Sequence, residues 1–450
     1  MASTYLTRTS TAGNRQKFTT SFWFKLAKAD STRMSFFSAT ETTDGNELSY
    51  MRVDDKIWIR ESHSNNSDLI LETNRIFRDI NAWYHIVFTV DTTQATNTNR
   101  LKMYVNGVQE TSFAYETYPS QNYNTRWNES GQVMQIGRNT SGYPYYFDGS
   151  ISHFHHCDGY AYDASAFGFT DSTTGEWKIN TSPNVSYGNN GFFILKDGNS
   201  VTDSSPNTNN FTVAGGTLTK TEDNPSNNFA TINPLQSFSS GSLDIDFANT
   251  RVRGNGSAWM RANAGLAAKS GKWYYEAYIQ HTTSGRPIRL GWDSADNPNN
   301  GSDTYYSGFN ISTDGYIRGG VNGYNNYDPN ATALGVTFTT GDYIGLAIDI
   351  DGDTVTAYKN GTVISNVNAL SLSGFTYCSV KKSRGHWITP SVVFYSQSNN
   401  DNRTEFNFGN GAFANTQLTG TTYTDSAGFG VFKYQPPTGY LAWCTKNLNQ

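Results

Sequence analysis

The run His153-Phe154-His155-His156-Cys157 combines the residue types best suited to metal chemistry. In an extended strand, alternation would place His153, His155 and Cys157 on one face. A zinc site needs ligands that converge tetrahedrally, usually from two elements. No second His/Cys pair supplies the remaining ligands, because the other histidines are scattered at His63, His85, His281 and His386. We therefore predict no metal site and expect structural or loop histidines.

Glu41, Asp44 and Glu47 are the acidic residues closest to a glycosidase pair. A retaining glycosidase holds two carboxyl groups about 5–5.5 Å apart. On a strand this requires even spacing, but Asp44 lies at odd spacing from both glutamates. The intervening Thr, Gly and Asn residues are typical of a loop. We predict no catalytic residues and no enzyme, and a glycan-degrading activity is the least favoured of three functions.

The sequence Asp349-Ile350-Asp351-Gly352-Asp353 resembles a calcium loop at first sight. An EF-hand needs Gly at its sixth position and Glu at its twelfth, but Gly352 is fourth. A tight turn between two strands explains the Asp-Gly pair. We predict no cofactor here. Calcium in another loop of the first half stays open, because Asp, Asn and carbonyl oxygens are plentiful.

Aromatic residues in polar loops are the stronger functional lead. The proposed ligand-binding residues are Tyr118, Tyr123, Trp127, Tyr145, Tyr146, Tyr305, Tyr306, Tyr324 and Tyr327. Tyr115 and Tyr143 stand in the same stretches. Aromatic faces beside side-chain amides suit sugar rings, and tyrosine also serves protein interfaces. The alternative is that these side chains only cap the ends of the fold.

Composition limits the classes of partner. The 450 residues carry 33 Lys+Arg against 38 Asp+Glu, a net charge of -5. Without a basic run, nucleic acid is not expected as a partner. No apolar run approaches about 18 residues, so we expect no membrane span. The first ten residues lack the apolar core of a signal peptide, and three distant cysteines argue against a disulfide framework.

Short strands separated by turn signals dominate the first half. Residues 17–25 alternate so that Phe18, Phe22 and Phe24 share one face. Residues 48–53 and 56–60 predict a hairpin with Asp54-Asp55 at its turn. No long apolar period of 3.6 residues appears, while aromatic residues reach 14%. This pattern predicts an all-β sandwich or barrel.

The second half repeats this logic. Residues 271–279, Gly-Lys-Trp-Tyr-Tyr-Glu-Ala-Tyr-Ile, predict a central strand in which Trp273 and Tyr275 are core residues. Strands are also expected at 342–349 and 354–358, before the turn Asn360-Gly361. Polar turn residues between the halves indicate a connector.

Several motifs carry family likenesses. The second half resembles a SPRY domain in Lys-Trp-Tyr-Tyr-Glu and five later motifs, at 272–276, 288–292, 341–349, 357–361, 389–392 and 406–409. The first half is similar to a laminin-G-like, concanavalin A-like jelly roll at 22–24, 83–87, 104–107, 136–138 and 147–151. These likenesses imply two concanavalin A-like jelly-roll β-sandwiches in tandem. The expected divisions are a jelly roll at 1–215, a connector at 216–237, a SPRY-like sandwich at 238–412 and a C-terminal docking tail at 413–450.

The junction at 159–235 and the closing segment 436–448 resemble proteins of tailed bacteriophages, marine ones especially, that join the same two domains. This resemblance implies a non-enzymatic virion surface protein, such as a tail fibre or appendage, that binds a host-surface glycan or protein. The alternative is a capsid decoration, cement or tail-connector protein with a purely structural role. Implied partners are other virion proteins and copies of itself, with a trimer suggested by phage appendages in general. The implied location is the virion exterior after synthesis in the host cytoplasm.

Overall fold

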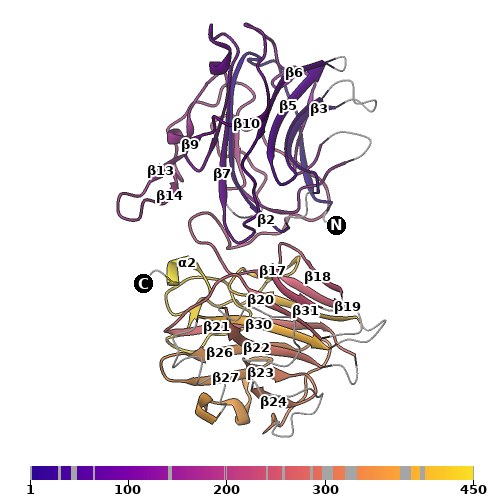
Figure 1. Cartoon of the computed structure of the whole chain (residues 1–450), viewed down its shortest axis with the longest axis vertical. Helices are drawn as coiled ribbons and strands as arrows, with labels where there is room; N and C mark the ends of the chain where they lie inside the picture. Colours follow the sequence, from indigo (N-terminus) through magenta and orange to yellow (C-terminus); the bar gives the residue numbers. More distant parts are fainter. Residues whose placement is uncertain are drawn as a thin grey trace. The chain divides into compact units, whose positions relative to one another are not determined.

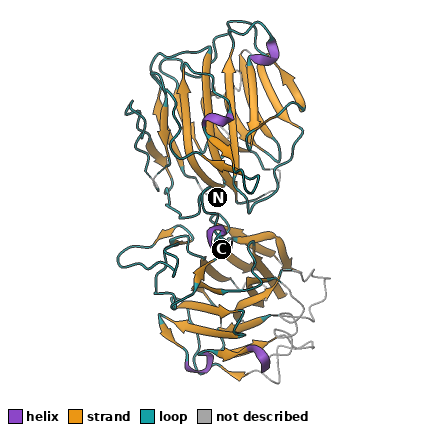
Figure 2. Cartoon of the chain, turned by 90° about the vertical axis from the view of Figure 1, so that its left-hand side faces the viewer, coloured by secondary structure: helices purple, strands orange, loops and turns teal. Residues whose placement is uncertain are grey.

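The computed structural model describes residues 3–28, 32–41, 48–63, 66–139, 144–196, 198, 200–239, 242–255, 259–283, 287–295, 308–319, 332–374, 387–395 and 401–448. The chain divides into two compact units (Figure 1). One comprises Met1–Thr219 with Asn224–Ser226, and the other comprises Lys220–Asp223 with Asn227–Gln450. Strands joined by loops make up both units (Figure 2), so the predicted all-β sandwich class is confirmed.

The first unit is built from two large sheets. The eight-stranded sheet has the order β10-β6-β5-β4-β3-β11-β1-β16. Its strands are β1 (Tyr5–Thr9), β3 (Met34–Glu41), β4 (Leu48–Val53), β5 (Ile57–His63), β6 (Asn66–Thr73), β10 (Phe113–Thr117), β11 (Val133–Ile136) and β16 (Thr212–Gly215). The six-stranded sheet has the order β15-β12-β2-β7-β8-β9. Its strands are β2 (Lys17–Leu26), β7 (Tyr84–Asp91), β8 (Leu101–Val105), β9 (Val108–Gln109), β12 (Gly149–Asp158) and β15 (Phe192–Ile194).

An aromatic core fills the space between these sheets. Phe18, Phe22 and Phe24 on β2 are fully buried in it, as their alternation predicts. The Phe22 and Phe154 rings stack with centroids 4.9 Å apart. Aromatic side chains bury large areas, so they can supply a core where the overall apolar share is only 36%.

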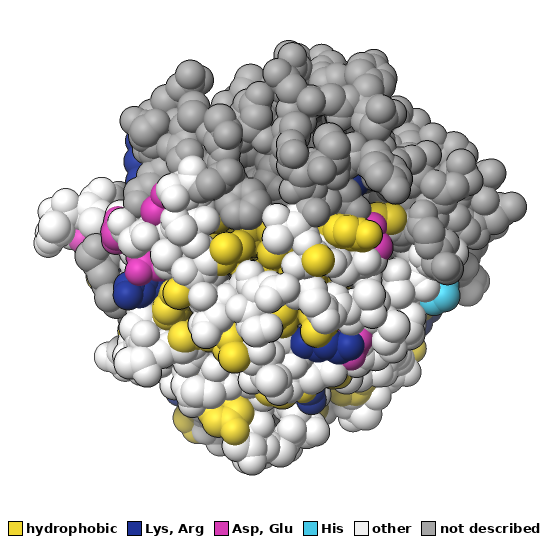
Figure 3. All heavy atoms as spheres, turned by 90° about the horizontal axis from the view of Figure 1, so that it is seen from below, with side chains coloured by type: hydrophobic (Ala, Val, Ile, Leu, Met, Phe, Trp, Pro, Cys, Tyr) yellow, Lys and Arg dark blue, Asp and Glu magenta, His cyan; other side chains and the backbone are white. Residues whose placement is uncertain are grey.

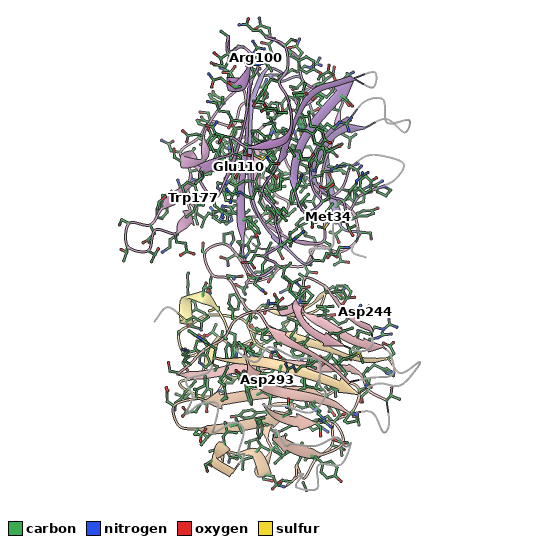
Figure 4. All side chains as sticks on the ribbon, viewed as in Figure 1. Met34, Arg100, Glu110, Trp177, Asp244 and Asp293 are labelled. Carbon is green, nitrogen blue, oxygen red and sulfur yellow. The ribbon has the colours of Figure 1, made fainter. Side chains whose placement is uncertain are left out.

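A separate segment covers the outward face of the six-stranded sheet. It contains the 3-10 helix η2 (Ala164–Ala166) and the hairpin of β13 (Gly168–Thr170) with β14 (Trp177–Ile179). Phe167 and Tyr187 pack there against Cys157 in a second cluster. Trp177 projects from β14 beside this sheet (Figure 4). A further 3-10 helix of this unit is η1 (Asn97–Asn99).

The second unit has two large sheets and the small two-stranded sheet of β32 (Ala412–Phe413) and β33 (Thr416–Gln417). The seven-stranded sheet is ordered β17-β20-β30-β22-β23-β24-β25. Its strands are β17 (Ile232–Ser239), β20 (Trp259–Ala264), β22 (Ile288–Ser294), β23 (Phe309–Ser312), β24 (Tyr316–Gly319), β25 (Thr332–Ala333) and β30 (Ile388–Tyr395). The nine-stranded sheet follows β18-β19-β31-β21-β26-β27-β28, with β29 on β27 and β34 on β21.

The nine strands, in chain order, are β18 (Ser242–Asp246), β19 (Arg251–Asn255), β21 (Lys272–His281), β26 (Tyr343–Asp349), β27 (Thr354–Lys359), β28 (Thr362–Val363), β29 (Leu370–Ser371), β31 (Asn402–Asn407) and β34 (Leu441–Ala442). The remaining elements are η3 (Ser365–Val367), η4 (Leu372–Gly374) and α2 (Thr445–Leu448). Seen from the end that carries β24, hydrophobic side chains lie among polar ones (Figure 3).

The predicted central strand of the second unit is β21. It pairs with β26 along Lys272–Tyr278 and with β31 along Glu276–His281. Trp273 and Tyr275 point into the core, as predicted, and are 4% and 0% exposed.

Two of the expected divisions differ from the structure. β17 begins at Ile232, inside the segment 216–237 that was predicted to be a connector. The segment 413–450 is not a separate docking tail, because β34 pairs in parallel with β21 and Trp443 lies in the core of the second unit. The physical reason is the apolar run Leu-Ala-Trp-Cys, which is buried against its own sandwich.

Glu276 fixes this C-terminal segment to the nine-stranded sheet. Its fully buried carboxylate accepts hydrogen bonds from the backbone N–H of Lys433 (2.9 Å) and of Tyr434 (2.8 Å). The Asn407 amide donates to the same group at 3.0 Å, and the Tyr274 hydroxyl at 3.3 Å. Burial nevertheless raises the pKa of Glu276 to about 7, against the opposing effect of these donors.

Candidate functional site

The outward face of the eight-stranded sheet carries a row of side chains that crosses five strands. The register aligns Ser35 with Arg52, Arg52 with Trp58, Trp58 with Glu72, and Glu72 with Tyr115. Neighbouring residues along these strands, such as Met51, Ile59 and Leu71, point into the core. Because side chains alternate along a strand, the row must face away from the core. Pairing alone therefore assembles the row.

Trp58 is at the middle of this row. The Arg52 guanidinium carbon lies 4.5 Å from the Trp58 ring centroid and 5.3 Å from that of Tyr50. The Tyr115 ring stacks with Trp58 at 6.1 Å and an interplanar angle of 24°. Cation–π contacts of this kind hold a guanidinium in a fixed plane.

Asp54, at the predicted hairpin turn, connects the charged groups. Its carboxylate accepts from Trp58 Nε1 at 2.8 Å and pairs with Arg52 Nη2 at 3.2 Å. Arg33 Nε lies 4.0 Å from the same carboxylate. The turn backbone is closed by the bond from Asp54 N–H to the Lys56 carbonyl, at 3.0 Å. Asp54 thereby fixes the indole and a guanidinium together.

The row offers both stacking surface and hydrogen-bonding groups. Tyr115 is 63% exposed, whereas Arg52 and Glu72 are 8% and 4% exposed. Lys56 Nζ pairs with Glu72 Oε1 at 2.9 Å. Arg52 Nε, Glu72 Oε2 and Ser35 Oγ are buried without hydrogen-bond partners. Buried polar groups are normally paired, so these atoms mark positions that a polar ligand or water would satisfy. We call the aligned residues Arg52, Trp58, Glu72 and Tyr115, together with Asp54 from the adjoining turn, the arginine–aromatic row.

Two predicted loop tyrosines lie beside further arginines. The Tyr145 ring centroid is 5.8 Å from the Arg33 guanidinium carbon, so Tyr145 adjoins the arginine–aromatic row through Arg33 and Asp54. Tyr146 and Tyr5 flank Arg138, whose guanidinium carbon is 5.5 and 4.6 Å from their centroids.

Other predicted residues have structural environments. The Tyr118 hydroxyl donates to Glu116 at 3.0 Å, and burial with this carboxylate raises the pKa of Tyr118 to about 12. The Tyr123 hydroxyl lies 2.9 Å from Glu61 and 3.1 Å from Asp68. Burial and these two carboxylates raise the pKa of Tyr123 strongly.

Trp127 was predicted to bind ligand, and the structure contradicts this. The side chain is 0% exposed and packs against Phe18, with centroids 5.6 Å apart. Its polar sequence neighbours suggested exposure, but packing against the distant strand β2 determines its burial.

The second-half tyrosines Tyr305, Tyr306, Tyr324 and Tyr327 lie outside the described residues, as does Tyr143. Of the three carboxylates weighed as a glycosidase pair, Asp44 and Glu47 also lie outside them, and Glu41 ends β3. At the Asp-Gly turn, Asp349 accepts from Gly352 N–H at 2.7 Å, as expected for a turn.

The histidine run belongs to β12 and is enclosed. His155 stacks on Phe193 at 3.9 Å and lies 3.0 Å from the Tyr187 hydroxyl, while His156 bonds to Thr20 and Asn128. Burial lowers the pKa of His156 to about 3 and that of His155 well below its usual value. Within the described ranges, no group of three His, Cys, Asp or Glu side chains could hold a metal ion.

Sequence reasoning missed Arg52, Asp54, Trp58 and Glu72 because it sought binding residues in loops. The signal was present in the predicted hairpin. Tyr50 and Arg52 alternate with Met51 and Val53, as Trp58 and Arg60 alternate with Ile57 and Ile59. Aromatic and arginine residues at the outward positions of adjacent strands would have predicted the row.

One family model matches the chain. Residues 2–160 match the concanavalin A-like lectin/glucanases superfamily, a segment that includes the entire arginine–aromatic row. The concanavalin A-like fold predicted for the first half is thereby confirmed. No curated protein matches the chain. Among the described residues, no helix is both long and apolar enough to cross a membrane.

The solved structures that match parts of the chain include a SPRY domain and two other proteins. The SPRY domain of human HERC1 has 16% identity and a TM-score of 0.27, with 39% of this chain and 96% of that chain covered. The heptameric SAP-like pentraxin of Limulus polyphemus has 16% identity and a TM-score of 0.27, covering 36% and 72%. A Bacteroides ovatus protein described as carbohydrate-binding has 15% identity and a TM-score of 0.31, covering 49% and 58%.

Proposed function

We propose that this protein binds a carbohydrate on the outward face of its eight-stranded sheet, over the arginine–aromatic row. The observation that carries this proposal is the register, which places Trp58 and Tyr115 in one line with Arg52 and Glu72. An aromatic face takes the apolar C–H face of a sugar ring, while guanidinium and carboxylate groups bond its hydroxyls. The lectin/glucanases model that matches residues 2–160 supports the same ligand class.

Binding without cleavage is the mode that we propose. The two row carboxylates are held by cations, Asp54 by Arg52 at 3.2 Å and Glu72 by Lys56 at 2.9 Å. A carboxylate held in an ion pair is not free to protonate a leaving group or to attack a sugar. The row is therefore better suited to recognition than to hydrolysis.

A virion exterior is the location that we propose for this activity. Support comes from the resemblance of residues 159–235 and 436–448 to phage proteins that join a laminin-G-like and a SPRY domain. In this setting the carbohydrate would belong to the host surface. The structural alternative, capsid decoration or a tail connector, predicts that changes in the row impair assembly and leave adsorption to host cells unchanged.

Binding of the full chain to an array of glycans tests this function. The best ligand is then titrated calorimetrically into the wild type and two alanine variants. Trp58→Ala should weaken binding at least tenfold, or about 1.4 kcal/mol, because it removes the central ring. Trp177→Ala is the matched control, since Trp177 is also half-buried and belongs to the same unit. Equal losses in both variants, or no glycan bound by the wild type, would contradict the proposal.

A further inference from the structure

One arginine of the first unit differs from its neighbours in having no acidic partner. Arg52 and Arg33 both approach the Asp54 carboxylate, at 3.2 and 4.0 Å. The Arg138 guanidinium forms no hydrogen bond or ion pair with any other described residue. The Arg138 side chain is half-buried, and Nε is the one of its three nitrogens that is enclosed. Its two Nη groups are therefore available to donate hydrogen bonds to a ligand.

Two tyrosine rings hold this guanidinium in place. The guanidinium carbon of Arg138 lies 4.6 Å from the ring centroid of Tyr5 and 5.5 Å from that of Tyr146. The two rings are 6.1 Å apart, and both are half-buried. Because cation–π contacts use the face of the guanidinium plane, its hydrogen-bonding edges stay available. A side chain that is already ordered loses less conformational freedom when a ligand binds.

Arg138 lies on the same sheet face as the arginine–aromatic row. Tyr5 alternates with a core residue on β1, so its ring points away from the core. β11 pairs with β3, and just beyond their last paired residues the Gly137 N–H donates to the Phe36 carbonyl at 2.9 Å. This register brings the next residue, Arg138, level with Ser35, which continues the row on β3.

The segment that carries Tyr146 lies between Arg138 and the row. The Ser35 N–H donates to the Tyr145 carbonyl at 3.3 Å. From β5, which carries Trp58, three strand spacings lead across β4 and β3 to β11. At about 4.8 Å per spacing, the backbone at Arg138 stands about 14 Å from that at Trp58. This separation exceeds one sugar ring, so a short oligosaccharide would reach both side chains.

We propose that the carbohydrate bound by the arginine–aromatic row is acidic, and that Arg138 binds one of its carboxylates. This inference rests on the proposed function, because Trp58 would still stack on a sugar ring. The two Nη groups of Arg138 would donate parallel hydrogen bonds to the two carboxylate oxygens, a geometry that suits the planar guanidinium fork. Tyr5 and Tyr146 would keep this fork in its plane. Arg138 is then the residue that selects acidic sugars over neutral ones.

The test compares an acidic tetramer with its neutral counterpart on the full chain. Tetragalacturonate and its tetramethyl ester share one backbone and differ in charge. Calorimetric titration into the wild type should give a Kd about tenfold lower for the acid, because charge-assisted hydrogen bonds are roughly twice as strong as neutral ones. Arg138→Gln should reduce the affinity for the acid to that for the ester and leave the ester unchanged. Arg138→Lys should fall between, since it keeps the charge and loses the fork.

Arg100→Gln is the matched control. Arg100 belongs to the same unit and is also half-buried. Its guanidinium already donates to the backbone carbonyls of Gln94, Pro119 and Ala95, at 2.8, 2.9 and 2.8 Å. The change removes one positive charge, as Arg138→Gln does, and should leave the ratio of acid to ester affinity at its wild-type value. The ratio is the readout because partial unfolding of a variant would weaken both titrations equally.

Three results would overturn the inference. One is equal affinity of the wild type for the acid and the ester, which would leave the proposed function intact because sugar is still bound. Another is an equal loss of both ligands in Arg138→Gln, which would assign Arg138 to the sugar ring instead of the carboxylate. The third is no binding of either tetramer by the wild type, in which case the glycan array decides the proposed function separately.

Discussion

Each unit presents two outward sheet faces, and the members of each pair differ. In the first unit, Phe167, Trp177 and Tyr187 cover one face, and the other carries the arginine–aromatic row. In the second unit, Phe432 and Ala442 cover one face, and the other carries polar side chains such as Asn263 and Asn310. The covered faces make hydrogen bonds to buried titratable groups, such as His85 and Glu276. The arginine–aromatic row contains Glu72 Oε2, a buried oxygen without a hydrogen-bond partner, beside the exposed ring of Tyr115. We therefore propose that ligand recognition belongs to the arginine–aromatic row, and that the covered faces contribute stability.

The largest effect is expected from Glu276→Gln on the covered face of the second unit. Whichever way the new amide is turned, its nitrogen meets the N–H of Lys433 or Tyr434 and cannot accept from it. We expect a loss of about 1–3 kcal/mol in the free energy of unfolding, measured by urea denaturation, with earlier proteolytic cleavage of the C-terminal segment. Asp353→Asn, in a strand turn with φ +54°, should change neither. Unchanged stability of Glu276→Gln would show that Glu276 does not fix the segment.

The pH dependence of stability gives the next largest effect. The pKa of Glu276 is raised to about 7 in the folded chain, above the usual 4.5. Between these values the folded state binds more protons than the unfolded state, so stability should fall as pH rises from about 4.5 to 7. The slope contributed by one group reaches about 1.4 kcal/mol per pH unit. Denaturation at several pH values should show this slope, and Glu276→Gln should remove it. An equal slope in the variant would assign it to other groups.

Trp177→Phe tests the covered face of the first unit. The Trp177 indole N–H donates to His85 Nδ1 at 3.0 Å, and His85 Nε2 lies 2.8 Å from the Ser21 hydroxyl. Burial lowers the pKa of His85 to about 3, so the ring is neutral and its Nδ1 accepts the indole hydrogen bond. In the variant this buried nitrogen would have no donor. Thermal unfolding should report a loss of about 1 kcal/mol, with glycan affinity unchanged. Phe169→Leu, at an exposed residue of the same hairpin, should be neutral. A loss of affinity in Trp177→Phe would contradict the division of roles between the two faces.

Tyr115→Ala should give the smallest change. Tyr115 is 63% exposed and lies at the end of the arginine–aromatic row, so its removal should not alter the unfolding temperature. Loss of one stacking partner is expected to weaken glycan binding by about 0.5–1 kcal/mol, or roughly two- to fivefold. Calorimetric titration would measure this. An unfolding temperature lowered by several degrees would show that Tyr115 stabilises the sheet rather than serving recognition.

The fold was more predictable than the site. Local alternation identified β21 with Trp273 and Tyr275 in the core, and turn chemistry identified the hairpin around Asp54. Trp127 shows the limit, because its burial against Phe18 depends on strands far apart in sequence.

The arginine–aromatic row shows the same limit for function. Arg52 and Glu72 are aligned only by the pairing of β4, β5 and β6, and no sequence motif joins them. The C-terminal segment was identified as apolar, but its partner β21 lies about 170 residues earlier, and nothing local specifies that pairing.

We propose that sugar binds on the arginine–aromatic row and not on the covered face. Hydroxyl-radical footprinting of the full chain, with and without the best glycan from the array, tests it residue by residue. We predict that the glycan lowers the oxidation of Trp58 and Tyr115 and leaves the oxidation of Trp177 unchanged. Protection of Trp177 with no change at Trp58 and Tyr115 would contradict the account.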